Sequence, residues 1–406
     1  MKFLHISDLH IGKRINEFPM IEDQKYILRQ ILEIAGDGGV QGILIAGDIY
    51  DKQSPSAEAV QVFDWFLTAL ADLGKEVFVV SGNHDSPERL SFGARLMRER
   101  AVYVSRAYDG NALRVELKDE YGAVYVHLLP FIRPAFLRYV LEKESEHKGE
   151  VKAPETYQEA VRMAVERMEI DPLARNILVA HQFVTGAGRC ESEEVAVGGI
   201  DNVDAEVFAP FDYVALGHIH SPQWVGRESV RYCGTPLKYS FSEWEQQKSV
   251  TILELKEKGN LSVTVLPLKP LHDMRRIRGT YMEVTSPSFY NKEERERKIC
   301  AGSGQEGACP EKEDYVQITL TDEEDIIDAF MKLRIIYPNL MRLNYDNSRT
   351  RRDQGTQAAE DVEQKSELAL LGEFYELQNN QPMSGQQIEF AKKLIESCRG
   401  DNQEEK

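Results

Sequence analysis

Residues 43–51 read ILIAGDIYD, and residues 77–85 read VFVVSGNHD. Each stretch starts with four apolar residues that favour a buried strand, and each continues into glycine and polar residues at the end of that strand. Residues 57–73 between them predict an amphipathic helix, with apolar side chains three or four positions apart at Val60, Phe63, Leu67 and Leu70. The alternation of strand and helix predicts an α/β fold.

Further apolar runs extend this pattern over the first 270 residues. They predict strands at residues 124–129, 177–180, 213–216, 249–255 and 261–266. Strands alternate with helices at first and then follow one another directly. This order favours a layered β-sandwich flanked by helices, with some antiparallel pairing. We therefore assign residues 1–270 to one α/β domain.

The pattern changes near residue 271. Residues 275–284 predict a strand, residues 322–334 a helix and residues 341–345 a last strand, which together predict a small α/β capping domain over residues 271–346. Residues 291–314 are rich in charge and glycine and have no apolar period, which predicts a mobile loop or insertion.

Residues 347–406 predict a polar linker followed by two helices, at about residues 358–378 and 384–397. Each helix has an apolar stripe, and a stripe of this kind must be buried against something. It would pack on the capping domain or dock on a partner protein, and we favour the partner.

The bulk composition limits the class of protein. The chain has 406 residues, of which 42% are hydrophobic, and no apolar run reaches the roughly 18 residues of a membrane span. The N-terminal residues lack a signal-peptide pattern, so we expect a cytoplasmic protein without membrane association. The net charge of -18 argues mildly against a nonspecific nucleic-acid binder, although arginines gather at residues 275–278 and 349–352.

The five cysteines are scattered and include no CxxC pair, which argues against a zinc ribbon. Cys300 and Cys309 are close enough in sequence for a disulfide, but reduced thiols are the expectation for a cytoplasmic chain.

Five polar blocks carry the candidate chemistry. In chain order they are Asp8-Leu9-His10, Gly47–Asp51, Gly82–Asp85, His181 and Gly217–His220. Nearly all of them follow a short apolar run, so their side chains are expected at strand ends. Carboxylate, amide and imidazole groups in this number suit two adjacent metal ions, which makes a hydrolase of phosphate esters the first hypothesis.

The candidate ligands divide between two ions. Asp8, His10 and a distant histidine would hold the first, and Asn83, His181 and His218 would hold the second. Asp48 can bridge them, because a carboxylate has two oxygens. A mixed oxygen and nitrogen set favours Mn²⁺, Fe or Zn²⁺ over Mg²⁺. We expect two Mn²⁺ ions per chain and leave Mg²⁺, Fe and Zn²⁺ open.

His84 follows Asn83 directly, so its side chain is expected to point away from the metals. It can donate to a phosphate oxygen or protonate the leaving alkoxide. A histidine in this role needs an orienting group, which Asp51 or Asp85 could supply, and we favour Asp51. The glycines that precede the ligands, at positions 47, 82 and 217, allow tight turns and close backbone approach.

The blocks DxH, GDxxD, GNHD, a single histidine and GHxH, in this order, resemble the calcineurin-like metallophosphoesterase superfamily over residues 1–270. The resemblance implies a metallophosphoesterase fold with His84 as the catalytic histidine. It implies as metal ligands Asp8, His10, Asp48, Asn83, His181, His218 and His220.

A finer resemblance is to the bacterial SbcD nuclease family. It is carried by residues 181–184, 197–199, 217–222 and 234–243. It implies a Mn²⁺-dependent DNA double-strand exonuclease and hairpin endonuclease that acts in DNA repair, recombination and replication at the nucleoid. It also implies a partner, an SbcC-like SMC-type ATPase, docked through the C-terminal helices. A homodimer through the helices at residues 57–73 and 87–100 would make a heterotetramer with the ATPase.

Two rival functions stay open at this point. A phosphatase or cyclic-nucleotide phosphodiesterase would use the same scaffold without requiring the cap or the tail. A non-catalytic scaffold would use its metals only to stabilise the fold.

Overall fold

The computed structural model describes residues 1–37, 39–148, 153–188, 190–193, 202–287, 289, 313–324, 326–348 and 350, and, toward the C-terminus, residues 368, 371–372, 375, 383–385 and 387–392. The predicted C-terminal helices and the 291–314 segment lie largely outside this set, and residues 197–199, Cys300 and Cys309 lie entirely outside it. The chain forms two compact units. The first contains Met1–Arg278, Met282–Thr319 and Asp328–Asn344, and the second contains Gly279–Tyr281, Leu320–Ile327 and Tyr345–Lys406.

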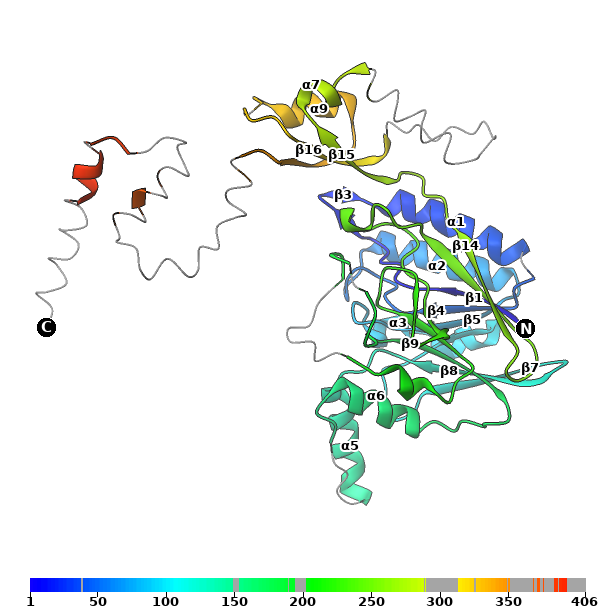
Figure 1. Ribbon diagram of the computed structural model, residues 1–406. Coiled ribbons are helices and arrows are strands. Elements are labelled where there is room, and N and C mark those ends of the chain that lie inside the picture. The colour runs from blue at the N-terminus through cyan, green and yellow to red at the C-terminus, as the bar shows by residue number, and fades with distance from the viewer. Residues whose placement is uncertain are drawn as a thin grey trace, which may run out of the picture. The chain divides into compact units, whose positions relative to one another are not determined.

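Two six-stranded sheets lie face to face among the described residues of the first unit (Figure 1). The first sheet has the order β14 (Leu261–Pro267), β13 (Ser249–Leu255), β1 (Lys2–Ile6), β4 (Gly42–Ala46), β5 (Glu76–Val80) and β6 (Val102–Val104). The second has the order β11 (Gln223–Val225), β12 (Arg227–Tyr232), β10 (Tyr213–Gly217), β9 (Arg175–His181), β8 (Gly122–Leu129) and β7 (Leu113–Asp119). The layered sandwich and all five strands predicted between residues 124 and 266 are confirmed.

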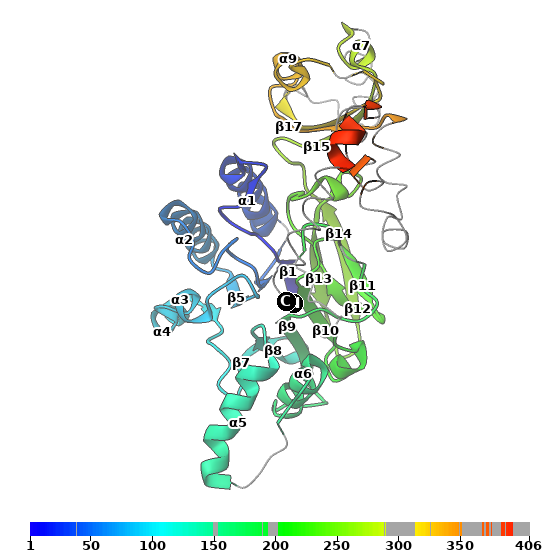
Figure 2. The same cartoon turned by 90° about the vertical axis from the view of Figure 1, so that its left-hand side faces the viewer.

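Helices cover the outer faces of both sheets, as Figure 2 shows. The helices on the first sheet are α1 (Ile21–Asp37) and α2 (Ala57–Asp72), and those on the second are α5 (Pro134–Lys148) and α6 (Tyr157–Glu166). Among the described residues, no helix combines the length and the apolar character needed to cross a bilayer.

The central strands are buried on both faces. In β4, Ile43 and Ile45 pack with the helices, whereas Leu44 and Ala46 pack against the second sheet. Residues that alternate along a strand point to opposite faces, so a continuous apolar run fills two cores at once. The central parallel strands β1, β4 and β5 thus end at one common edge.

Helix α2 begins and ends as predicted, and its buried face matches the predicted one in part. The Ser56 hydroxyl caps it by accepting from the Ala59 amide at 3.2 Å, and Leu73 and Gly74 follow its last turn. The buried side chains are Ala59, Val62, Phe63, Phe66 and Leu70. Val60 of the predicted stripe is 43% exposed. The buried face is therefore rotated toward Val62 and Phe66.

Two other predicted elements are interrupted. The helix expected at residues 87–100 is broken into α3 (Pro87–Leu90) and α4 (Ala94–Met97), followed by a 3-10 turn at Arg98–Arg100. Gly93 between them has φ 75°, a left-handed conformation that a continuous helix does not contain. The strand expected at residues 275–284 ends earlier, since β15 spans Met274–Gly279 and a helical turn, α7, spans Tyr281–Val284.

The capping elements form a three-stranded sheet in the order β15, β16 (Tyr315–Leu320), β17 (Leu340–Tyr345). Helix α9 spans Ala329–Ile336 and begins later than the predicted start at residue 322. The carboxylates of Asp322 and Glu323 instead accept hydrogen bonds from the main-chain amides of Tyr281 and Ser348, which holds this part of the chain out of a helix.

This sheet joins the α1 side of the sandwich through one buried carboxylate. Asp23, 2% exposed, accepts hydrogen bonds from the Tyr315 hydroxyl at 2.8 Å and from His272 Nδ1 at 3.0 Å. Phe18, from the hairpin of β2 (Arg14–Ile15) and β3 (Phe18–Pro19), packs its ring against Tyr315.

Arg175 ties the two sheets together at the edge opposite the polar loops. This arginine of β9 is 1% exposed and donates to both oxygens of Asp119, the last residue of β7 in the same sheet. It also donates to the carbonyls of Leu255 and Lys256, at the end of β13 in the other sheet. The hydrogen bonds from Arg175 hold the pKa of Asp119 well below its usual range.

Replacing Arg175 by methionine should therefore lower the free energy of unfolding at pH 7 by about 2 kcal/mol, because its charge-assisted hydrogen bonds to Asp119 and across to β13 are lost while Asp119 keeps its ion pair with the Met1 amine. Asp119 has a depressed pKa in the folded state, so its contribution is present above the ordinary pKa of about 3.9 and is lost as the pH falls below it. Urea unfolding of both proteins should show their difference shrinking toward about pH 3.

Lys118→Met is a matched control, because the Lys118–Glu116 pair is solvent-exposed, at 75% and 45% for the two side chains. Its unfolding free energy should stay close to that of the wild type. An Arg175→Met protein as stable as this control would show that Arg175 does not hold the sheets together.

Candidate metal centre

The five polar blocks gather where strands of the two sheets end. Asp8 and His10 follow β1, Asp48 follows β4, and Asn83 follows β5. The loops after β1 and β4 run side by side, since the amides of Asp8 and His10 donate to the carbonyls of Gly47 and Asp48, each at 3.0 Å. The second sheet contributes His181 at the end of β9, and His218 and His220 just after β10. The structure thus brings together all the predicted ligands.

The backbone at several ligands is in an uncommon conformation. Asp8, Asp48 and His218 have φ of 52°, 49° and 104°. Residues other than glycine rarely adopt positive φ, and where they do, the surrounding structure must hold them there. The sharp turns at these strand ends aim the side chains into one shared space.

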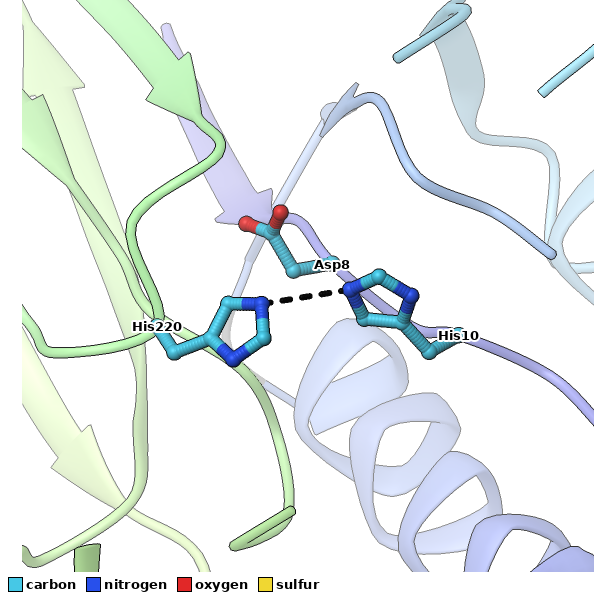
Figure 3. A group of neighbouring side chains, drawn as sticks. All are labelled: Asp8, His10 and His220. Carbon is cyan, nitrogen blue, oxygen red and sulfur yellow. Dashed lines mark hydrogen bonds between the residues drawn. The ribbon is translucent and has the colours of Figure 1, made fainter. Parts of the chain in front are cut away.

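One group of ligand atoms comes from Asp8, His10 and His220, which lie within 4.8 Å of one another. Figure 3 shows the two imidazoles facing each other, with 3.2 Å between His10 Nε2 and His220 Nε2. The distant histidine that the sequence left unnamed for this position, and that the family resemblance identified as His220, lies here.

A second group surrounds Asn83. Its Oδ1 lies 3.0 Å from His181 Nε2 and 2.9 Å from His218 Nδ1. Asp48 Oδ2 lies 3.3 Å from the same His181 nitrogen. These three side chains and Asp48 are the predicted ligand set of the second ion.

Asp48 lies between the two groups. Its Oδ2 is 3.7 Å from His10 Nε2 in the first group, while it faces His181 in the second. Its other oxygen accepts the main-chain amide of His84 at 2.9 Å. Asp48 thus lies between the two groups, with a single oxygen facing both while the second one accepts from the GNHD loop.

The histidine tautomers fit metal ligation. His181 Nδ1 donates to the Ala46 carbonyl at 2.9 Å, which leaves Nε2 with its lone pair toward Asn83 and Asp48. His220 Nδ1 is bonded to the Ser192 hydroxyl at 2.7 Å, which leaves Nε2 toward His10. Hydrogen bonds of this kind orient imidazole ligands in metalloproteins.

The charges of the buried carboxylates also favour bound cations. Burial raises the pKa of Asp8 to about 7, and nearby Asp48 adds to the rise. Burial acts to raise the pKa of Asp48 too, but neighbouring His181 outweighs it and holds that pKa well below its usual range. Against the effect of burial, Asp48 raises the pKa of His181 to about 9. Two buried carboxylates among imidazoles therefore fit two divalent cations that would neutralise them.

His84 lies at the open side of this space. Its side chain is 18% exposed, whereas His10 and His181 are buried. Its Nδ1 lies 3.1 Å from the main-chain carbonyl of Asp51 and can donate to it, and its Nε2 lies 4.0 Å from Asp48 Oδ2. His84, His10 and Asp48 also form a third cluster of side chains able to hold a metal.

The two carboxylates considered as orienting groups have different surroundings. Asp51 provides its main-chain carbonyl to His84, while its carboxylate forms an ion pair with Lys13 at 2.8 Å. Asp85 accepts from the amides of Ile49, Tyr50 and Gly82, at 2.9–3.1 Å. Asp85 thus fastens the GNHD loop to the neighbouring GDxxD loop, and the residue whose contact orients the ring is Asp51.

A buried network behind His220 was missed by sequence reasoning. Glu243, fully buried, forms an ion pair with Lys248 at 2.5 Å and accepts from the Ser192 hydroxyl at 2.6 Å. Glu193 accepts the main-chain amide of His220 at 2.7 Å. Only the resemblance of residues 234–243 to a known family pointed to this region, because long-range hydrogen bonds leave no periodic signal in the sequence.

Gln24 of α1 was missed as well. Its side-chain amide donates to the His10 carbonyl at 2.7 Å and to the Tyr239 hydroxyl at 3.0 Å, and its oxygen accepts from the Gly12 amide at 2.9 Å. The residue looks like an ordinary polar position of a helix, yet it fixes the loop that carries Asp8 and His10.

The glycines before the ligands are required by close contacts, as predicted. A Cβ on Gly217 would lie 1.8 Å from the Ala46 carbonyl oxygen, and one on Gly82 would lie 2.1 Å from Asp48 Oδ1. A Cβ on Gly47, which has φ 85°, would lie 2.4 Å from His181 Nδ1. The loops of the two sheets can approach closely enough to bring the candidate ligands together because no side chain stands between them here.

Comparison with known proteins agrees with this arrangement. Residues 1–222 match the calcineurin-like phosphoesterase family. Residues 270–379 match a family described as the type 5 capsule protein repressor C-terminal domain. A curated protein of Staphylococcus epidermidis, named as a subunit of the nuclease SbcCD, is 31% identical over 402 residues, which cover 97% of this chain and 98% of that protein.

Solved structures are more distant. A dimetal phosphatase from Danio rerio aligns with a TM-score of 0.40 at 12% identity, over 66% of this chain and 96% of the other. The TT1561 protein of Thermus thermophilus aligns with a TM-score of 0.36 at 14% identity, over 65% of this chain and 98% of the other.

Replacing Gly217 by alanine should weaken metal binding, because the new Cβ overlaps the Ala46 carbonyl that orients His181. We expect the affinity for Mn²⁺, measured by titration calorimetry, to fall by about 10- to 100-fold. Gly36→Ala is the control, since Gly36 lies in α1 and a Cβ there meets nothing within 4 Å. Equal Mn²⁺ affinity in the two variants would show that the contact between Gly217 and Ala46 does not need glycine.

Proposed function

The chain belongs to the SbcD family of calcineurin-like phosphoesterases, and we propose on that premise that it is the nuclease subunit of an SbcCD-like complex, hydrolysing DNA phosphodiester bonds in repair and recombination. The observation that carries this proposal is the pair of ligand groups that share Asp48, with His84 beside them but more exposed. The relative that is similar over almost the whole chain is named as part of a nuclease.

The residues would hold two divalent ions, one at Asp8, His10 and His220, the other at Asn83, His181 and His218, with Asp48 shared. Two bound ions would polarise the phosphoryl oxygen and lower the pKa of a water molecule that attacks phosphorus. We propose Mn²⁺, because imidazole and amide ligands are mixed with carboxylates.

His84 is proposed as the catalytic histidine. The Asp51 carbonyl can fix Nδ1 as the protonated nitrogen, so the ring presents Nε2 to the site. From this position a protonated ring would donate to a phosphate oxygen or give its proton to the leaving alkoxide. Lys13 pairs with the Asp51 carboxylate at the same opening, and its ammonium group would contact a phosphate of an arriving strand.

The capping sheet is proposed to bind DNA, with residues 271–346 as its domain. β15 places Arg276 and Arg278 at alternate, exposed positions, which puts both guanidinium groups on one face. Arg275 is paired with Asp314 at 3.2 Å. Of the arginine cluster noted in the sequence, the two exposed members would contact phosphates.

We propose a homodimer through α2 and the α3–α4 region. Apolar side chains there are unusually exposed, with Phe92 at 83%, Leu96 at 73% and Val60 at 43%. Burying such side chains would stabilise a dimer interface. Two copies and two ATPase subunits would give a heterotetramer, located in the cytoplasm at the nucleoid.

Residues 347–406 are proposed as the linker and docking helices for an SMC-type ATPase. Among the described residues of this stretch, Phe390 is 68% exposed and Ile388 is 38% exposed. Apolar side chains that are exposed in the isolated chain are suited to anchoring in the groove of a partner.

Ile388→Ser combined with Phe390→Ser should abolish co-purification with the ATPase subunit, because the apolar anchors are lost. Mn²⁺-dependent cleavage by the variant chain itself should persist, since the metal centre lies in the other unit. Lys392→Ser, in the same segment, serves as the control. Full co-purification of the double variant would refute docking through this helix.

His84→Gln should lower the rate of Mn²⁺-dependent cleavage of a linear DNA duplex by about 10²- to 10⁴-fold while two Mn²⁺ ions still bind. The reason is that glutamine cannot transfer the proton, whereas the predicted ligands remain. Unchanged cleavage would leave His84 without a catalytic role. Wild-type protein that cleaves only small phosphate esters would identify a phosphatase or cyclic-nucleotide phosphodiesterase instead, and one that cleaves neither would identify a metal-stabilised scaffold.

A further inference from the structure

A cavity of about 570 Å³ adjoins the metal centre on the side of the GNHD loop. Asp85 and Phe131 are among its lining residues. The Phe131 ring is stacked near His218, at 6.5 Å and 17°, and meets His181 edge-on at 6.1 Å. One aromatic ring therefore lies against both the cavity and the ligand cluster, so the two sites are immediate neighbours.

The rest of the lining offers flat apolar faces. Phe136 and Tyr139, on the exposed side of α5, are 52% and 57% exposed and line the same cavity. Lys143 Nζ lies 4.3 Å from the centre of the Tyr139 ring. Aromatic rings flanked by cations are the usual platform for unpaired bases, which stack on them in a sequence-tolerant way.

The charges of the cavity favour a neutral ring over a phosphate. The carboxylates of Glu88, Asp109 and Glu144 also line it. They would repel a phosphate group placed inside but leave a base, with its amino and imino donors, free to enter.

A neighbouring cavity of about 280 Å³ has the opposite character. It shares Ala107, Asp109 and Pro130 with the first cavity and is lined in addition by Arg95, Arg98 and Arg106. Ser105 also lines it, is 1% exposed, and its hydroxyl has no hydrogen-bond partner among the described residues. Three guanidinium groups and an unpaired buried donor suit a phosphate.

We propose that the two cavities together form a binding site for an unpaired nucleotide of a DNA strand held at the metal centre. The base stacks on Phe136 and Tyr139, and a phosphate of the same strand binds at Arg95, Arg98 and Ser105. This inference rests on the proposed nuclease function and specifies the form of its substrate: the strand beside the scissile bond is single. Hairpin loops and frayed ends meet that requirement, whereas a fully paired strand cannot place a base in the cavity.

Stacking is measured with an oligonucleotide carrying 2-aminopurine in a single-stranded loop, because the fluorescence of this base is quenched when it stacks. The protein carries His84→Gln in every arm, so that the strand is bound but not cut. We expect quenching on binding, and we expect Phe136→Ala with Tyr139→Ala to remove it and to weaken binding by tenfold or more. Trp224→Ala, which removes an equally exposed aromatic residue from the distant strand β11, should leave both unchanged.

Phosphate binding at Arg95 and Arg98 is tested by the salt dependence of strand binding. Arg95→Gln with Arg98→Gln should reduce the slope of log affinity against log salt by about 0.7, since the two arginines bind one phosphate and each phosphate contact on a single strand accounts for about 0.7. Lys118→Gln, which removes an exposed cation elsewhere, should not change the slope.

Quenching that persists in the Phe136/Tyr139 double variant overturns the proposal. So does an unchanged salt slope, or a double variant that binds the strand normally but no longer associates with the ATPase, which would make the cavity a protein interface. These results would leave the nuclease function intact if wild-type protein still cleaves duplex DNA. Absence of strand binding and of all DNA cleavage would overturn both.

Discussion

Two like-charged side chains, Asp8 and Asp48, are brought together in a buried space, and the rest of the structure depends on making that arrangement stable. Burial and mutual repulsion raise the pKa of Asp8 to about 7, so a protein without compensating cations would hold this site poorly. Five imidazoles and an amide oxygen surround the two carboxylates with geometry that divides them into two ligand groups. Glycines 47, 82 and 217 let the loops approach without side chains, and Arg175 closes the opposite edge of the two sheets. The fold can therefore be understood as a support that carries ligands from two sheets to one point.

Much of this could be predicted from the sequence because short-range rules govern it. Apolar runs followed by glycine and polar residues identified the central strands and placed the candidate ligands at strand ends, and the family resemblance of the blocks named the seven side chains that the fold brings together. The face of α2 could not be predicted fully from spacing, since Val60 and Leu67 fit a helical period as well as Val62 and Phe66 do, and only the position of the sheet decides which pair is buried. The break at Gly93 depends on one left-handed residue in a segment that otherwise reads as a helix.

The residues that support the ligands were the hardest to foresee. Gln24 contacts Tyr239, 215 positions away, and Ser192 contacts His220 and Glu243, 28 and 51 positions away. Nothing near these residues in sequence indicates such a hydrogen bond. The role of Asp51 could not be predicted from its residue type either. It contacts His84 through its main-chain carbonyl, which every residue has. Fold and ligands follow from local patterns, whereas the groups that orient the ligands follow from tertiary packing.

The sharing of Asp48 by two ions is tested most directly by electron paramagnetic resonance of the purified chain titrated with Mn²⁺. Ions bridged by one carboxylate lie about 3.5–4 Å apart, so the account predicts two Mn²⁺ per chain with a spectrum that shows magnetic coupling between them. Replacing Asp48 by asparagine should remove the coupling. A single Mn²⁺ per chain, or two ions without coupling in the wild type, would contradict the shared metal centre on which the proposed function rests.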